Sequence, residues 1–477
     1  MNRMKKIACT GGPASEAGFY PVNPVILSLL FFLGSVLPCC TLLLTCKAEA
    51  APPDPDIARF ISAKSNQVYL ASRDSDNPVP PEVWEMFSAA SVADWKGASN
   101  LFQGILTRQQ HSSGPHRLAP EVWGRVQEVG VFCNTIPSYN LKFIRLFADE
   151  VFKVVPSGGI FISGSDAGRI AITALSASQE DGKPFMTVSQ DNLFDNVYLE
   201  YVRGLYRQQA KLPDAAAADK ATSEYASDLT QRWQHDQQFP NQPRQVLPGE
   251  EIRMVNGQMQ ISGQLPFQTI TALLVRDIVN DNPEREIYLE PNRLEEWMYA
   301  RLEPAGPVFK MRHTPADALF EETVRNDREY WQLLTRRLIG VLVHDDMDLA
   351  EICAAAQDLV GKPKDFQGDA EFLKDENARL FFSKLRSANG AVYAWRMMRA
   401  KSTSERRQME REAELAFRQA YLLCPLNTDV IARYIAFFAA AHRKEDLEKF
   451  AAAAEKLLPR DKAPYVRQIT DWARTQN

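Results

Sequence analysis

Four short apolar runs alternate with helical segments between residues 157 and 314, and this alternation constrains the fold more than any other feature of the sequence. The first run, 159–162, leads through a glycine-containing turn into a helical pattern that starts at Ile170. The remaining runs are 183–189, 286–290 and 307–312, and a helix is predicted over 266–279. Short, partly β-branched runs separated by helices are typical of a small, mostly parallel sheet with covering helices. We therefore expect an α/β domain over 157–314.

Helical periodicity predominates on both sides of this domain. Three amphipathic segments predict a helical lead-in over 82–156, and a further helical region is expected over 315–404. Between the N-terminal leader and the lead-in, residues 51–81 contain six prolines, which indicate an extended tether. A polar stretch rich in Ala and Gln, about 208–249, interrupts the α/β pattern. The sequence thus predicts α/β plus all-α architecture.

An internal repeat marks the last part of the chain, 405–477. Ala420 aligns with Ala454, and Pro425 aligns with Pro459, in each case with a period of 34 residues. Small residues where two helices cross, and a proline after the second helix, are typical of tetratricopeptide repeats at this period. A coincidental pair of Ala-rich helices is the alternative interpretation. We predict two tetratricopeptide-like units that stack on neighbouring helices.

The first 50 residues have the pattern of an export leader. An uncharged run, 25–46, follows basic residues near the N-terminus, and the small residues Ala48 and Ala50 fit the site that signal peptidase cleaves. The run is also long enough to span a bilayer once. We expect an exported protein at the periplasmic or extracellular face, either released or anchored to the inner membrane by 25–46. Lipidation at Cys46 is a third alternative.

Polar residues that follow the first two predicted strands form the candidate ligand site. They are Asp166, Arg169, Asp191, Asn192, Asp195 and Asn196. In open parallel sheets, ligands bind outside the carboxyl ends of the strands, where helix N-termini present free N–H groups. Asp166 is suited to accept from a sugar hydroxyl, and Arg169 to pair with an anionic group. Helix capping is the alternative role for Ser, Asp and Asn at such positions.

Several chemistries lack their motifs in this chain. H-E-x-x-H, C-x-x-C and G-x-S-x-G do not occur, and the glycines around residue 164 fit neither a dinucleotide fingerprint nor a P-loop. The net charge of −5 argues against a nucleic-acid partner. We expect no metal, no cofactor and no catalytic residue.

Five segments, in the same order along the chain, together resemble the soluble C-terminal part of bacterial protein O-mannosyltransferase-like membrane proteins, a family otherwise described as of unknown function. The segments are 158–169, 186–206, 287–311, 382–396 and 416–425. The resemblance implies an extracytoplasmic α/β domain followed by helical repeats, normally attached to a multi-span body. Apart from 25–46 the chain has no run long enough to span a membrane, so no catalytic residue is carried over.

These observations lead to a functional hypothesis with two alternatives. The first is an exported, non-catalytic interaction module whose helical repeats bind an envelope protein or peptide. The second is an extracytoplasmic glycan-binding protein or enzyme that uses the strand-end site. The third is a subunit that completes a separate multi-span glycosyltransferase.

Overall fold

The computed structural model describes residues 54–73, 78–111, 117–176, 183–207, 209–247, 249–255, 258–291, 294–361 and 365–475. The export leader and its apolar run lie outside these residues. In the part of the chain that is described, no helix combines the length and apolar character that a membrane span requires.

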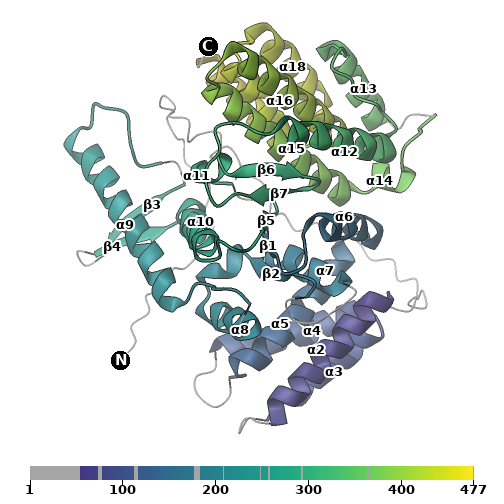
Figure 1. The fold of residues 1–477 in the computed structure, drawn as a ribbon, viewed down its shortest axis with the longest axis vertical. Coiled ribbons are helices and arrows are strands. Elements are labelled where there is room, and N and C mark those ends of the chain that lie inside the picture. Colours follow the sequence, from purple (N-terminus) through teal and green to yellow (C-terminus); the bar gives the residue numbers. More distant parts are fainter. Residues whose placement is uncertain are drawn as a thin grey trace.

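A five-stranded mixed sheet with the order β2-β1-β5-β7-β6 lies between two groups of helices (Figure 1). The strands are β1 (Ile160–Ser163), β2 (Met186–Ser189), β5 (Ile287–Leu289), β6 (Leu302–Ala305) and β7 (Val308–Met311). β1 pairs in parallel with β2 and β5, whereas β7 runs antiparallel to both β5 and β6. The α/β prediction is confirmed, but the sheet is mixed rather than mostly parallel. The difference arises because a tight turn at Gly306, with φ +62°, joins β6 and β7 as a hairpin.

Helices cover both faces of the parallel strands. One face is packed against α2 (Pro55–Arg73), α5 (Pro120–Thr135), α6 (Leu141–Val154) and α7 (Asp166–Leu175), and the other against α8 (Asn196–Tyr206), α9 (Ala215–Gln238) and α10 (Gln264–Asp281). Phe161 belongs to the first core and its neighbour Ile162 to the second, as alternation along a strand requires. The chain leaves β1 through α7 toward β2, and then returns through α8–α10 to β5 on the opposite side of β1. β1 therefore lies at a topological switch point, where ligands collect in open α/β sheets.

The predicted tether over 51–81 is wrong for most of its length. Residues 55–73 form α2, in which Ile57, Phe60, Ile61, Lys64 and Val68 are buried. The buried residues recur every three to four positions, and Pro55 occupies the first helical position, where proline is tolerated. α2 packs against α3 (Pro81–Ser91), α5 and α7, so it is part of the folded body.

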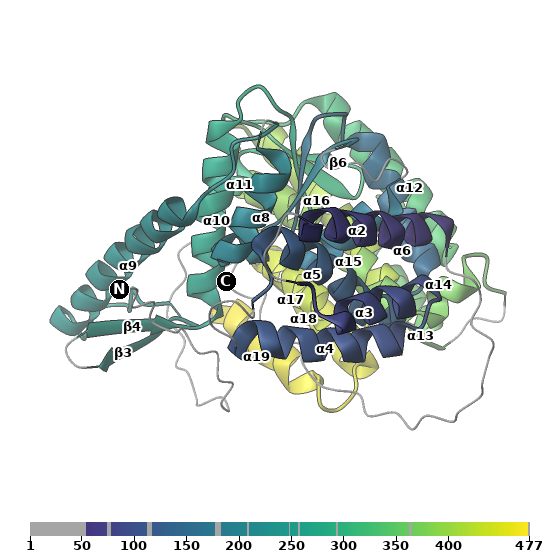
Figure 2. The ribbon, with the colours of Figure 1, turned by 90° about the horizontal axis from the view of Figure 1, so that it is seen from below.

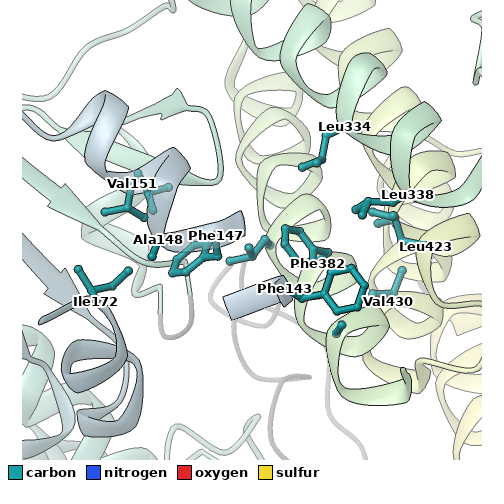
Figure 3. Close-up of a cluster of buried hydrophobic side chains, with 14 of the residues drawn as sticks. Phe143, Phe147, Ala148, Val151, Ile172, Leu334, Leu338, Phe382, Leu423 and Val430 are labelled. Carbon is teal, nitrogen blue, oxygen red and sulfur yellow. The ribbon is translucent and has the colours of Figure 1, made fainter. Parts of the chain in front are cut away.

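The helical lead-in is continuous with the rest of the fold. The first of its helical segments consists of two helices, α3 and α4 (Trp95–His111), which are separated at Ala93 with φ +59°. Figure 3 shows α6 side chains meeting those of the C-terminal helices. Phe143 lies 5.3 Å from Phe372 and Phe147 lies 4.9 Å from Phe381, measured between ring centroids. One hydrophobic core therefore joins the lead-in, one face of the sheet and the C-terminal helices.

The C-terminal region is helical, as expected. Its helices are α12 (Glu321–Ile339), α13 (Leu349–Gly361), α14 (Ala370–Lys374), α15 (Glu376–Arg399), α16 (Thr403–Leu423), α17 (Thr428–Ala440), α18 (Lys444–Leu457) and α19 (Ala463–Thr475). α17 packs against α15, α16, α18 and α19. α16 and α18 end 34 residues apart, and both Ala420 and Ala454 are fully buried.

An arm projects from one side of the molecule (Figures 1 and 2). It consists of α9 and a hairpin of β3 (Glu251–Val255) and β4 (Gln258–Ser262). Glu250, which directly precedes β3, links the hairpin to α9. It accepts hydrogen bonds from Tyr225 Oη (2.6 Å) and from both terminal nitrogens of Arg232 (2.6 and 2.7 Å). The polar stretch over 208–249 is thus largely helical.

Candidate functional site

The C-terminal ends of the three parallel strands place three polar side chains in one row, which we term the strand-end row: Ser189, Ser163 and Glu290. Ser163 is the register partner of Ser189, so their side chains leave the sheet on the same face. Glu290 directly follows β5 and its Oε2 accepts a hydrogen bond from Ser163 Oγ at 2.5 Å. All three residues are at least nine-tenths buried. These three polar residues thus lie side by side at the ends of the parallel strands.

The Glu290 carboxylate lies under the first turn of α7. Its Oε2 also accepts from the Gly164 backbone N–H at 3.2 Å. A methyl carbon built on Gly168 would lie 2.9 Å from this oxygen and 2.6 Å from Ser163 Oγ. Only glycine therefore lets the helix approach the row this closely. The N-terminal end of α7 carries a partial positive charge, and an internal carboxyl group occupies it.

Burial raises the pKa of Glu290, and the nearby Asp191 carboxylate acts in the same direction, although the donors Ser163 and Gly164 oppose both. Because the pKa is higher in the folded protein than in the unfolded chain, stability contributed by the protonated group is lost as pH rises through the folded value. The row consequently holds a carboxyl group whose ionisation is costly to the fold.

Two side chains at the end of β2 are fully buried without using their hydrogen-bonding capacity. In the described part of the chain, Ser189 Oγ has no hydrogen-bond partner, and neither do Gln190 Nε2 and Oε1. Buried polar atoms are rarely left unpaired, because each costs about 1–3 kcal/mol. The Ser189 backbone is not involved in this deficit, since its N–H donates to Tyr198 Oη at 2.7 Å. These unpaired side chains are the feature of the site that most needs an explanation.

Four of the sequence-predicted residues lie around the outer side of the row. Asp191 and Asn192 are partly exposed in the short 3-10 helix η2 (Asp191–Phe194), and Asn196 is partly exposed at the start of α8. Asp195 is exposed and caps α8, accepting from the Val197 N–H at 2.9 Å. The alternative role of capping is therefore confirmed for Asp195. Of these four, Asp191 is the one whose charge acts on Glu290.

The other two predicted residues are Asp166 and Arg169. Asp166 begins α7, but its side chain lies outside the described part of the structure. Ser165 caps this helix instead, since its Oγ accepts from the Gly168 N–H at 3.1 Å. Arg169 is 1% exposed and its Nη1 bonds to Glu128 Oε1 at 2.7 Å. Its guanidinium is consequently engaged inside the protein rather than presented at the strand ends.

Glu128 of α5 bonds two cations at once. Besides Arg169 it pairs with Lys64 of α2 at 2.8 Å, and the carboxylate is 2% exposed. Burial alone would raise the pKa of Glu128, but the Lys64 ammonium and the Arg169 guanidinium outweigh it and hold the pKa at about 2. This cluster fixes the positions of α2, α5 and α7, and so supports the turn that carries Gly164 and Gly168.

The side chains of the strand-end row are hydrogen-bonding groups. Among the residues whose positions are described, no group of three or more His, Cys, Asp or Glu side chains is placed to hold a metal ion. The row combines two hydroxyls and a carboxyl group, and the Gln190 amide directly follows it in the chain; these groups can both donate and accept.

Comparisons with protein-family models, with curated protein sequences and with solved structures find no match to this chain.

The sequence-predicted site does not include Ser189, Ser163 or Glu290. Each ends or directly follows an apolar run, in the segments IFIS, MTVS and IYLE. A polar residue at the end of all three runs was the available signal. Its significance depends on the register of β1 with β2 and with β5, which lies more than 100 residues farther along the chain, and the local pattern does not show this register.

Proposed function

We propose that the protein is an exported, non-catalytic binding protein that takes a small polar ligand at the strand-end row. The observation that carries the proposal is the fully buried Ser189 hydroxyl and Gln190 amide, which have no hydrogen-bond partner in the described structure. A ligand that supplies partners would offset their desolvation. The position outside the ends of β1, β2 and β5, at a topological switch point, supports the same proposal.

The experiment is a thermal-shift screen of the purified protein against sugars, polyols, amino acids and phosphorylated sugars, followed by calorimetric titration of each compound that raises the melting temperature. Binding with a stoichiometry of one would support the proposal. The absence of any binding across these classes would contradict it.

Replacing Ser189 by alanine is expected to have opposite effects on stability and binding. The free energy of unfolding should rise by about 1 kcal/mol, because an unpaired buried hydroxyl is removed. Affinity for the ligand found in the screen should fall about fivefold, because one hydrogen bond is lost. Urea denaturation and calorimetric titration give the two quantities.

The matched control is Ser387→Ala. Ser387 is as buried as Ser189, but its Oγ accepts from Arg433 Nη1 at 2.7 Å. This substitution should lower stability and leave ligand affinity unchanged. A Ser189→Ala variant that behaved in the same way would show that its hydroxyl is structural.

A second candidate function is partner binding through α15–α19. The observation that favours it is the packing of α17 among its neighbours together with the 34-residue interval between the ends of α16 and α18. These features support the proposed tetratricopeptide-like repeats and the proposed relation to the accessory region of O-mannosyltransferase-like membrane proteins.

The chain itself covers part of α15. On α15, Trp395 Nε1 donates to Glu296 at 3.1 Å, and Arg396 Nη2 donates to the Leu302 carbonyl at 3.3 Å. An envelope protein or peptide would therefore bind α18 and α19, since residues 430–439 of α17 are buried between the neighbouring helices. Cross-linking of the protein to an envelope extract should then place the cross-links on α18 and α19, whereas cross-links confined to α2–α6 would contradict it.

A further inference from the structure

The hairpin of the projecting arm has edges that pair with no further strand. Its sheet has the order β3-β4, so within the described residues each strand pairs only with the other. Both views show α9 and this hairpin standing away from the body of the molecule (Figures 1 and 2). An edge strand offers its outward N–H and C=O groups to any strand that can lie beside it.

β3 lacks several features that block association at such an edge. Its sequence, EIRMV, contains neither proline nor lysine, and its five residues pair with β4 in a continuous register without a bulge. Proline, lysine and bulges are devices by which natural edge strands avoid one another. The two charges that β3 carries, on Glu251 and Arg253, are of opposite sign. They determine which partner strand the edge can accept.

Glu251 and Arg253 project from one face of the hairpin, and their side chains are 58% and 73% exposed. Within the chain Arg253 Nη2 lies 3.9 Å from a Glu251 oxygen, and the same oxygen accepts from Ser262 Oγ at 3.1 Å. Ile252, between the two charged residues, is half-buried on the opposite face, opposite its register partner Ile261. Both charged groups therefore keep most of their surface available to a partner strand.

The backbone of β3 is suited to pair with a second copy of itself. Val255 and Gln258 are paired and two residues separate them, and the pair that flanks a two-residue turn is hydrogen-bonded. Hydrogen-bonded and non-hydrogen-bonded pairs alternate along an antiparallel ladder, so Ile252 directs its N–H and C=O to the outer edge. Two β3 strands can then pair antiparallel about a two-fold axis at Ile252.

The charges select this register. With the axis at Ile252, Glu251 of each copy lies opposite Arg253 of the other, at positions where facing side chains are closest. An axis one residue earlier or later would place Glu251 opposite Glu251, or Arg253 opposite Arg253, and like charges directly opposite each other destabilise strand pairing. β4, with the sequence QMQIS, has no charged residue and so offers no equivalent selection.

We infer that β3 is a homodimer interface, through which two copies of the chain join their hairpins into one four-stranded antiparallel sheet with the strand order β4-β3-β3-β4. The interface is isologous, because both copies contribute the same residues. This inference does not depend on the proposed ligand site.

Sedimentation velocity of the purified full-length protein, from about 1 to 100 μM, tests the inference. We expect a monomer–dimer equilibrium within this range. Arg253→Glu should raise the dissociation constant at least about tenfold, because carboxylates then face each other on both sides of the axis. Glu251→Arg should have the same effect, because guanidinium groups then face each other.

The double variant Glu251→Arg/Arg253→Glu exchanges the two charges and keeps them complementary. Its dissociation constant should return to within about threefold of the wild-type value. Lys220→Glu is the matched control, since Lys220 is exposed on α9 and the substitution changes the net charge as Arg253→Glu does. It should leave the dissociation constant unchanged. Circular dichroism and the melting temperature establish that each variant is folded.

Three outcomes would overturn the inference. The first is a wild-type protein that stays monomeric at every concentration. The second is a dimer whose dissociation constant neither single reversal changes, since its interface would then lie elsewhere. The third is a double variant that associates no better than the single variants, because the two charges would then not face each other across the axis.

Discussion

Replacing Glu128 by glutamine is expected to lower the free energy of unfolding by about 3–5 kcal/mol, because it removes the negative partner of two buried cations. Lys64 and Arg169 are 3% and 1% exposed, and each lies within 2.8 Å of a Glu128 oxygen. The effect should depend on pH. The pKa of Glu128 is about 2 in the fold, below its ordinary value of 4.5, so the carboxylate contributes its full stability above pH 4.5. That contribution is lost as pH falls from 4.5 toward 2.

Urea denaturation at a series of pH values measures this effect. The difference between wild type and Glu128→Gln should be largest above pH 4.5 and shrink at lower pH. Glu121→Gln is the matched control, because Glu121 is exposed on the same helix and its variant should change stability by less than about 0.5 kcal/mol. A similarly small change in Glu128→Gln would contradict the role assigned to the cluster.

The second large effect is expected for Asp327→Asn in the helical region. Asp327 of α12 is 2% exposed and accepts from Arg386 Nη1 (2.8 Å), Asn389 Nδ2 (2.8 Å) and Tyr393 Oη (2.9 Å), all on α15. Arg386 is fully buried and also donates to Gln419 on α16 at 2.8 Å. Loss of the negative charge should cost about 3–5 kcal/mol, since a buried guanidinium then lacks its counterion.

A double-mutant cycle tests the second effect. Asp327→Asn combined with Arg386→Met should cost less than the sum of the single variants, because no unbalanced charge remains. Glu322→Gln, at an exposed ion pair on the same helix, should leave stability nearly unchanged. Additive effects of the two buried substitutions would show that Asp327 and Arg386 do not act as a pair.

Local patterns were sufficient to predict the strands that contain consecutive apolar residues. β1, β2, β5 and β7 overlap the predicted runs, because strands that are largely buried on both faces are mostly apolar in sequence. β6, with the sequence LEPA, has two partly exposed positions and a proline, so it lacks this signal. Its strand conformation depends on pairing with β7.

α2 and α9 were not predicted, for a different reason. α9 buries only Ala218, Ala221, Tyr225 and Leu229, so its apolar stripe consists largely of alanine within a polar sequence. For α2, the nearby prolines indicated an extended tether, although the helix has a regular buried stripe that includes Lys64. In both cases the packing partner decides the structure, and the partner is distant in the sequence.

The sequence-predicted site and the strand-end row lie at the same edge of the sheet but have different central residues. Sequence reasoning placed it after β1 and β2, and Asp191 lies there. It assigned a ligand role to Arg169, whose partner Glu128 lies 41 residues earlier in a different helix. It also omitted Glu290, which reaches Ser163 from 127 residues away. Such long-range pairs are defined by topology, so a single sequence does not reveal them.

Hydrogen–deuterium exchange with and without the ligand found in the screen tests the central claim most directly. We expect slower exchange at the backbone amides of 163–169 and 189–192, which surround the strand-end row, and unchanged exchange in α16–α19. Protection confined to α16–α19, with the strand ends unaffected, would contradict it and favour the helical repeats as the binding surface.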